Sequence, residues 1–193
     1  MDSLVLETGP AAVLLWGSVG AWSLGELVMS RRQAGGGAAS DPSYVAMSAG
    51  IALSFLLSFA AAAWDGGRLP GGRTWPAVAG ICLVWTGIAL RVWSIRTLGR
   101  FFTYAVTVAG DQRVVRSGPY RALRHPSYTG LLVGVLGIGI ALGGWLTVVT
   151  AVAPPLCAVL VRIRVEEAAL SARLGDEYRD YAAATKRLVP GVW

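Results

Sequence analysis

Five apolar runs constrain this sequence more than any other feature. They cover residues 10–29, 44–64, 75–96, 128–142 and 145–161, and the fourth run is the shortest. Because a helix rises about 1.5 Å per residue, about 20 apolar residues are needed to cross the hydrocarbon layer of a bilayer. Charged residues make up only 15% of the chain, against about 25% in soluble domains, so they are too few to cover a globule. We therefore expect an all-α integral membrane protein with about five transmembrane helices, forming a single domain over residues 1–193.

The basic residues predict how these helices are oriented. With five spans and the N-terminus outside, 14 of the 17 lysines and arginines fall on cytoplasmic segments, two fall outside, and Arg91 lies within a span. Cytoplasmic loops carry an excess of basic residues, so this pattern predicts a cytoplasmic C-terminus. The arginines flank apolar runs, so the net charge of +6 favours contact with membrane lipids and no nucleic acid partner. Lys186 is the only lysine, a composition typical of a GC-rich genome, and we expect a bacterial plasma membrane.

The N-terminal residues and the cysteines limit processing and metal chemistry. No lysine or arginine precedes Arg31, so the first run lacks the basic start of a cleaved signal peptide and is expected to stay in the protein. Cys82 and Cys157 both lie in apolar runs, and the chain has only one histidine, so we expect no metal site. The sequence also lacks a glycine-rich phosphate loop and a nucleophilic serine or cysteine motif.

One polar segment interrupts the apolar sequence, "GPYRALRHPSYTG" at residues 118–130, and it contains the only histidine. Gly118-Pro119 predicts a turn, and Pro126 restricts His125 to an extended backbone. His125 is therefore expected at the end of a loop on the membrane surface. The alternative is a basic interfacial cluster that only orients the fourth helix, since arginines near helix ends commonly extend toward water.

Two further polar groups lie at or inside the apolar runs. Arg162 and Glu166 are four residues apart where the fifth run ends, so they share one helix face and either form an ion pair or face a pocket together. Glu26 and Arg91 each interrupt a run that is otherwise able to span. Ionisable residues in a span usually face the bundle interior or a partner, so these two either pair with each other or extend to the surface, in a structural role.

Three segments carry weaker patterns. The fourth run has glycines at 130, 134, 137, 139 and 143, a spacing that lets helices approach closely in lipid. If this approach leaves a groove, the groove admits a flat or elongated ligand. Residues 101–108 predict either an extended segment or an interfacial helix. Residues 162–188 predict an amphipathic C-terminal helix whose apolar stripe folds back on the spans. The stripe consists of Leu170, Leu174, Tyr178, Tyr181, Thr185 and Leu188.

The combination of "GPYRALRHPSYTG" with "RIRVEEAALSARLGDEYRDYAAATKRLVP" resembles the isoprenylcysteine carboxyl methyltransferase family, which groups with bacterial and phospholipid methyltransferases. The likeness begins at "GIALRVWSIRTLGRFFT" and covers about residues 87 to 190, whereas the first two runs carry no signature. It implies a bundle whose cytoplasmic ends enclose S-adenosylmethionine, in part through a loop between the third and fourth spans, with a lipid-like acceptor entering from the bilayer.

The resemblance also implies roles for individual residues. Arg162 matches the arginine that positions the acceptor, most simply the carboxylate of an isoprenylcysteine-type substrate. In eukaryotic members the position of Gln112 is commonly histidine. The residues that match cofactor contacts are Gln112, Arg113, Val114, Val115, Tyr120, His125, Pro126, Ser127, Tyr128 and Glu166.

Two other functions fit parts of the sequence. An NADPH-dependent membrane reductase of the steroid or sterol type carries a similar "RHP" segment, typically followed by Asn where this chain has Ser127. A small transporter or a scaffold is the non-enzymatic alternative. A polar conduit would need charged residues in the fourth and fifth runs, and those runs have none.

Overall fold

Helices make up the regular structure of this chain. The computed structural model describes residues 5–7, 9–32, 41–64, 67–106, 108 and 110–191. Its elements in order are α1 (Pro10–Arg32), α2 (Pro42–Ala63), α3 (Thr74–Leu98), the 3-10 turns η3 (Gly99–Phe101) and η4 (Gly118–Arg121), α4 (Pro126–Ala141), α5 (Trp145–Leu174) and α6 (Asp176–Ala184). No strand occurs among the described residues, which confirms the predicted all-α class.

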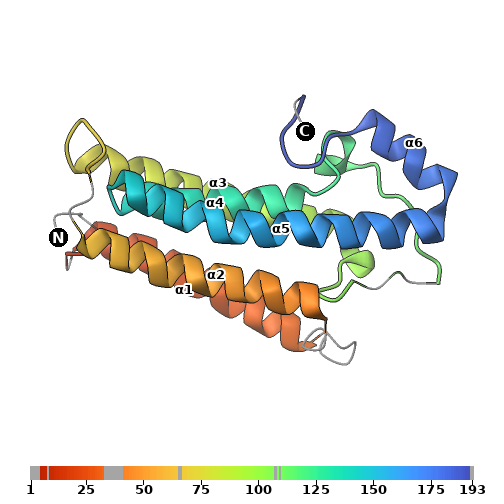
Figure 1. The fold of residues 1–193 in the computed structure, drawn as a ribbon, viewed down its shortest axis with the longest axis horizontal. Coiled ribbons are helices and arrows are strands. Elements are labelled where there is room, and N and C mark those ends of the chain that lie inside the picture. The colour runs from red at the N-terminus through yellow and green to blue at the C-terminus, as the bar shows by residue number, and fades with distance from the viewer. Residues whose placement is uncertain are drawn as a thin grey trace.

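The five long helices lie side by side along the longest axis, and successive helices run in opposite directions (Figure 1). Four of them, α1, α2, α3 and α5, are long and apolar enough to cross a membrane, and α4 is a shorter apolar helix. The fourth predicted span therefore corresponds to the short α4, and the fifth lies within α5. At about 1.5 Å per residue, the 30 residues of α5 measure about 45 Å, so this helix projects beyond the hydrocarbon layer.

Glycines decide how closely α3 and α4 pack, and these two helices have the most extensive contact in the bundle. A Cβ atom on Gly87 would lie 2.5 Å from the carbonyl oxygen of Gly130, and one on Gly80 would lie 2.5 Å from that of Gly137. Gly139 faces the first turns of α5 in the same way. The predicted packing role of the glycines in α4 is thus confirmed, because only hydrogen fits between these backbones.

The predicted C-terminal helix over residues 162–188 needs correction. Residues 162–174 continue α5 without a break, and Gly175, with φ of +58°, ends that helix and starts α6. Glycine adopts positive φ at no steric cost, so the chain can turn at this residue. The apolar stripe continues on both sides of Gly175, and its periodicity therefore does not reveal the break between the two helices. Beyond α6 the chain is not helical up to residue 191.

The tail after α6 returns to the bundle and pairs with the loop before α4. The Arg124 amide donates to the Lys186 carbonyl at 2.7 Å, and the His125 amide donates to the Arg187 carbonyl at 3.1 Å. Side chains of the predicted apolar stripe are buried here, among them Tyr178, Tyr181 and Leu188. These contacts bring the end of the chain against the polar segment at residues 118–130.

The segment after α3 is neither a strand nor a continuous helix. It makes the 3-10 turn η3 and then runs irregularly, and residue 107 lies outside the described part. The Asp41 carboxylate, at the start of α2, accepts hydrogen bonds from the amides of Ser43 and Val106 at 2.8 and 2.7 Å. Burial alone would raise the pKa of Asp41, but a hydrogen bond from the Ser43 hydroxyl, together with the two from these amides, lowers it to about 2. The glycine-rich stretch "AGGGAAS" at residues 34–40, whose composition predicts a loop, lies outside the described residues.

Candidate active site

α6 and the segments before α4 meet at one end of the bundle (Figure 1). The side chains of this end line a cavity. Its walls come from the segment after α3, η4, the first turn of α4, the last turns of α5, and α6. The candidate cofactor residues that line it are Gln112, Arg113, Val114, Val115, Tyr120, His125, Ser127, Tyr128 and Glu166. Pro126 starts α4 behind this wall and is fully buried, and Arg162 lies outside the lining.

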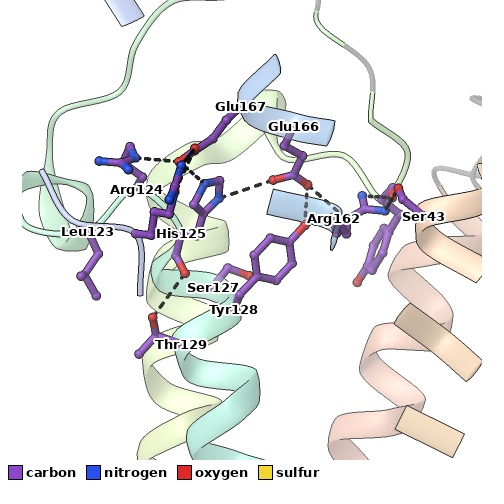
Figure 2. A network of polar contacts seen from close by, with 12 residues as sticks. Ser43, Leu123, Arg124, His125, Ser127, Tyr128, Thr129, Arg162, Glu166 and Glu167 are labelled. Carbon is purple, nitrogen blue, oxygen red and sulfur yellow. Dashed lines mark hydrogen bonds and ion pairs between the residues drawn. The ribbon is translucent and has the colours of Figure 1, made fainter. Parts of the chain in front are cut away.

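His125 lies between two carboxylates. It is the residue before the first turn of α4, and Pro126 begins the helix. Its Nδ1 is 3.5 Å from Glu166 Oε2 and its Nε2 is 3.3 Å from Glu167 Oε1. Figure 2 shows the ring between the two carboxylates. The imidazole also stacks on the ring of Tyr128, with centroids 5.8 Å apart. The only histidine is therefore held by contacts on both ring nitrogens and on one face.

The charge state of His125 follows from these contacts. Burial alone would lower the pKa of the imidazole, because it penalises the charged form. The hydrogen bonds and negative charges of Glu166 and Glu167 outweigh burial and raise the pKa above its ordinary value. The arrangement thus favours an imidazolium cation bridging two carboxylates, with no lone pair available to accept a proton.

Glu167 joins the loop before α4 to the tail. Its Oε1 accepts from Arg124 Nε at 2.7 Å, and its Oε2 accepts from Arg187 Nη2 at 2.9 Å. Arg124 also donates to the carbonyls of Ala182 and Thr185. One carboxylate therefore binds two arginines and a histidine, which fixes the wall of the cavity that contains His125 (Figure 2).

Glu166 points the other way and connects the cavity to a buried arginine. Its Oε1 accepts hydrogen bonds from the Tyr128 hydroxyl and from Arg162 Nε, the latter at 3.2 Å. Arg162 is 1% exposed and also donates to the Tyr128 hydroxyl at 2.6 Å and to Ser43 Oγ, on α2, at 3.0 Å. Both interpretations of Arg162 and Glu166 hold in part, since the two residues form an ion pair and Glu166 also lines the cavity.

Of the two alternatives for Glu26 and Arg91, pairing with each other and extension to the surface, the structure shows the pair. Arg91 Nε and Nη2 donate to the two oxygens of Glu26 at 2.5 and 2.7 Å. Arg91 Nη1 also donates to Ser127 Oγ at 2.8 Å, and the Tyr104 hydroxyl donates to Glu26 at 2.8 Å. The pair therefore binds α1 to α3 and reaches Ser127, which lines the cavity.

A second, more apolar groove lies between α1, α2 and the α3–α4 pair. Glu26, Arg91 and Tyr104 lie at its polar end, next to the cavity. The rest of its lining is largely apolar and includes Val19, Trp22, Tyr44, Met47, Ile51, Phe55, Leu131, Val135 and Ile138.

Tyr178 is a cavity residue that the sequence motifs did not single out. It is 4% exposed, and its hydroxyl is the one buried side-chain polar atom without a hydrogen-bond partner in the described part of the chain. It lines the cavity together with Tyr181, Leu170 and Leu174. All four belong to the predicted apolar stripe, whose periodicity by itself predicts only a surface that docks on the spans. The sequence feature that could have indicated Tyr178 is the presence of a polar hydroxyl within an otherwise apolar stripe.

Comparison with known proteins adds the family. A family described as phospholipid methyltransferase matches residues 75–177. The chain belongs to this family. The match includes α3, α4, α5 and the start of α6, which carry most of the cavity, and it confirms the resemblance inferred from the two motifs.

Two curated relatives and one solved structure extend this result. The chain is 29% and 30% identical over 120 residues to protein-S-isoprenylcysteine O-methyltransferases B and A of Arabidopsis thaliana. Each match covers 61% of this chain and 61% of the relative, so the chain spans about three fifths of their length. The structure of the eukaryotic intramembrane Ras methyltransferase ICMT (isoprenylcysteine carboxyl methyltransferase) matches with a TM-score of 0.55 at 26% identity. That match covers 77% of this chain and 52% of the other. With four helices able to span, the shared fold identifies an integral membrane protein.

Proposed function

We propose that this protein transfers the methyl group of S-adenosylmethionine to the carboxylate of a membrane-embedded, isoprenylcysteine-type acceptor. The observation that carries the proposal is the cavity, because nine of the eleven residues implied by the resemblance line it. Membership of a methyltransferase family and the two relatives named for isoprenylcysteine methylation support the same chemistry.

The cavity suits the donor molecule in three respects. Glu166 presents a carboxylate that can hold the ammonium group of the donor. Leu98, Phe101 and Leu170 offer apolar contacts for the flat adenine ring. The unpartnered hydroxyl of Tyr178 supplies a hydrogen bond to a polar group of the ligand. We therefore assign donor binding to this cavity, with Tyr178 added to the residues that the resemblance implies.

The state of His125 favours a carboxylate acceptor. S-adenosylmethionine supplies an activated methyl on a sulfonium, and a carboxylate oxygen takes that methyl as the carbon–sulfur bond breaks, with no proton transferred. A lipid amine would have to lose a proton first, since an ammonium has no lone pair. His125 does not offer a free base for that step, because both ring nitrogens face carboxylates. The side chains around the cavity are arranged to position the reactants and exclude water.

The second groove is suited to the apolar part of the acceptor. It is lined by side chains of α1, α2 and α4, and its polar end contains Arg91, which hydrogen-bonds to Ser127 on the cavity wall. Arg162 lies between Tyr128, on the cavity, and Ser43, on α2. We propose that a prenyl chain occupies this groove and that Arg162 acts on the acceptor side by fixing Tyr128 and Glu166.

The test combines binding with turnover. Calorimetry on the full chain in detergent is expected to show binding of S-adenosylmethionine and of its demethylated product, and no binding of NADPH. Labelled-methyl transfer is then measured to N-acetyl-farnesylcysteine and, in parallel, to phosphatidylethanolamine. Transfer to the cysteine carboxylate alone is the expected result. Transfer to the amine of phosphatidylethanolamine would show that the acceptor is a lipid amine and not a carboxylate. Binding of NADPH without binding of S-adenosylmethionine would overturn the methyltransferase proposal.

A further inference from the structure

A third groove lies on the outer face of α4 and α5. Along α4 it is lined by residues at positions 129, 132, 133 and 136, and along α5 by residues at 152, 156, 160, 163 and 164. Both sets recur every three or four residues, so each helix contributes one stripe. Residues 187–189 of the tail close one end. Nine of the twelve lining residues are apolar, and none of the twelve lines the candidate active site.

The dimensions of the groove match one leaflet of a bilayer. From Val152 to Arg164 the helix advances 12 residues, which is about 18 Å at about 1.5 Å per residue. Half of a hydrocarbon layer of about 30 Å is about 15 Å. An acyl chain lying along this stripe would therefore extend from the membrane surface to about the bilayer midplane.

The charge at the closed end is positive. Arg164 is exposed and makes no hydrogen bond or ion pair with any residue that the structure describes. Arg162, two positions earlier, is rotated by about 200° and points into the bundle, where it is 1% exposed. The carboxylates nearest in sequence, Glu166 and Glu167, are engaged with His125, Arg124 and Arg187. Arg164 thus presents an uncompensated guanidinium at the level where lipid phosphates lie.

We propose that this groove, which we call the α4–α5 groove, binds one anionic phospholipid. Its acyl chain lies along Leu132, Leu136, Leu156 and Leu160, and its phosphate accepts a bidentate hydrogen bond from Arg164. A planar guanidinium matches phosphate geometry, and basic pockets between membrane helices on the cytoplasmic side bind anionic head groups. An uncharged occupant would leave Arg164 without a counter-ion.

The site has a structural link to the tail. Arg187 and Leu188 line the groove, Leu188 is 4% exposed, and its carbonyl accepts from Thr129 Oγ1 at 2.8 Å. Arg187 also holds Glu167, which contacts His125. A lipid bound in the groove therefore stabilises the segment that closes the cavity wall, and it does so without entering the cavity.

Native mass spectrometry of the full chain in detergent tests this site. Dioleoyl phosphatidylglycerol and dioleoyl phosphatidylcholine are added at equal concentrations. We expect one retained phosphatidylglycerol, bound about fivefold more strongly than phosphatidylcholine, because the choline ammonium of phosphatidylcholine offsets the phosphate charge that attracts Arg164. Arg164→Gln is expected to reduce retention of phosphatidylglycerol to that of phosphatidylcholine. Arg96→Gln is the matched control, because Arg96 is also exposed at the corresponding end of α3 and lines neither the cavity, the second groove nor the α4–α5 groove. This substitution should leave retention of both lipids unchanged.

A second variant tests the apolar lining of the α4–α5 groove while keeping the charge of Arg164. Leu156→Trp fills the groove while keeping Arg164, and it should also abolish retention of phosphatidylglycerol. Equal retention of the two lipids by the unmodified protein would overturn the proposal. Undiminished retention of phosphatidylglycerol by Arg164→Gln would also overturn it. So would a dimer of the unmodified protein that Leu156→Trp abolishes, because a second copy of the chain would then cover the groove.

Discussion

Glu166 is the residue on which most contacts of the candidate site converge. It approaches His125 through one oxygen and binds Tyr128 and Arg162 through the other, while it lines the cavity. Its negative charge is thus shared between the protein and the space in which we place the donor's ammonium group. A change that keeps its shape and removes its charge tests that placement.

Glu166→Gln is expected to weaken binding of S-adenosylhomocysteine by about tenfold or more. The physical reason is the loss of a hydrogen bond to a charged group, worth about 1.5–3 kcal/mol. Calorimetry measures the affinity, and the exposed Glu177→Gln on α6 is the control of equal charge change. Unchanged affinity in Glu166→Gln would mean that this carboxylate serves only its ion pairs.

Tyr178→Phe is expected to separate ligand binding from stability. The hydroxyl has no hydrogen-bond partner among the described residues, so its removal should leave the melting temperature in detergent unchanged or slightly raised. Donor affinity should fall about three- to tenfold, because one hydrogen bond contributes about 0.5–1.5 kcal/mol. Tyr181→Phe should do the opposite. Its hydroxyl donates to the carbonyls of Tyr120 and Leu123, so stability should fall.

The stability conferred by His125 should depend on pH. Its pKa is raised in the folded protein, so the folded state holds the proton more tightly than the unfolded chain. The contribution is complete below about pH 6.5, the ordinary histidine value, and is lost as pH rises through the folded pKa. Melting curves between pH 5.5 and 9 should therefore show wild type and His125→Gln converging at high pH. A gap that widens with rising pH would contradict the assigned charge state.

At the level of elements, the α3–α4 contact is the part of the bundle most sensitive to added volume. Gly87 and Gly130 face each other so closely that neither position has room for a methyl group. The first turn of α4 follows His125 directly, so any separation of these helices also displaces the cavity wall. Packing and site geometry are therefore coupled through the two glycines.

Gly87→Ala is expected to destabilise the protein by about 1–3 kcal/mol, the usual cost of overpacking a tight contact. Gly17→Ala is the matched control, because a Cβ at Gly17 on α1 meets nothing within 4 Å. It should leave stability unchanged or improve it slightly, since alanine favours helix. Thermal unfolding in detergent measures both. Equal effects of the two substitutions would show that the close approach of α3 and α4 at Gly87 contributes nothing to stability.

At the level of the whole molecule, the two ends of the bundle differ in charge and in the segments that form them. The candidate site, α6 and the tail lie at one end, and residues 67–73 lie at the other (Figure 1). Most of the basic residues lie at the end with the site. If that end faces the cytoplasm, the cavity is open to a soluble donor and the α4–α5 groove to the inner leaflet.

Reporter fusions in a bacterial host test this orientation. A fluorescent protein fused after the C-terminus should be fluorescent, and alkaline phosphatase at the same place should be inactive, because that end is expected in the cytoplasm. Insertion of each reporter at Pro70, in the loop between α2 and α3, should give the reverse pattern. Active phosphatase at the C-terminus would invert the proposed topology.

The sequence alone determined the helical class and the family, because apolar runs of the right length and two spaced motifs depend only on local order. Through the family resemblance it also supplied nine of the 21 residues that line the cavity. It did not determine where the C-terminal helix breaks, since Gly175 interrupts a pattern whose periodicity continues on both sides. Nor did it show that Tyr178 lacks a partner, that Glu167 joins His125 to the tail, or that Arg162 is buried against α2. Those facts depend on which segments distant in sequence come together, and only the packed tertiary structure decides that.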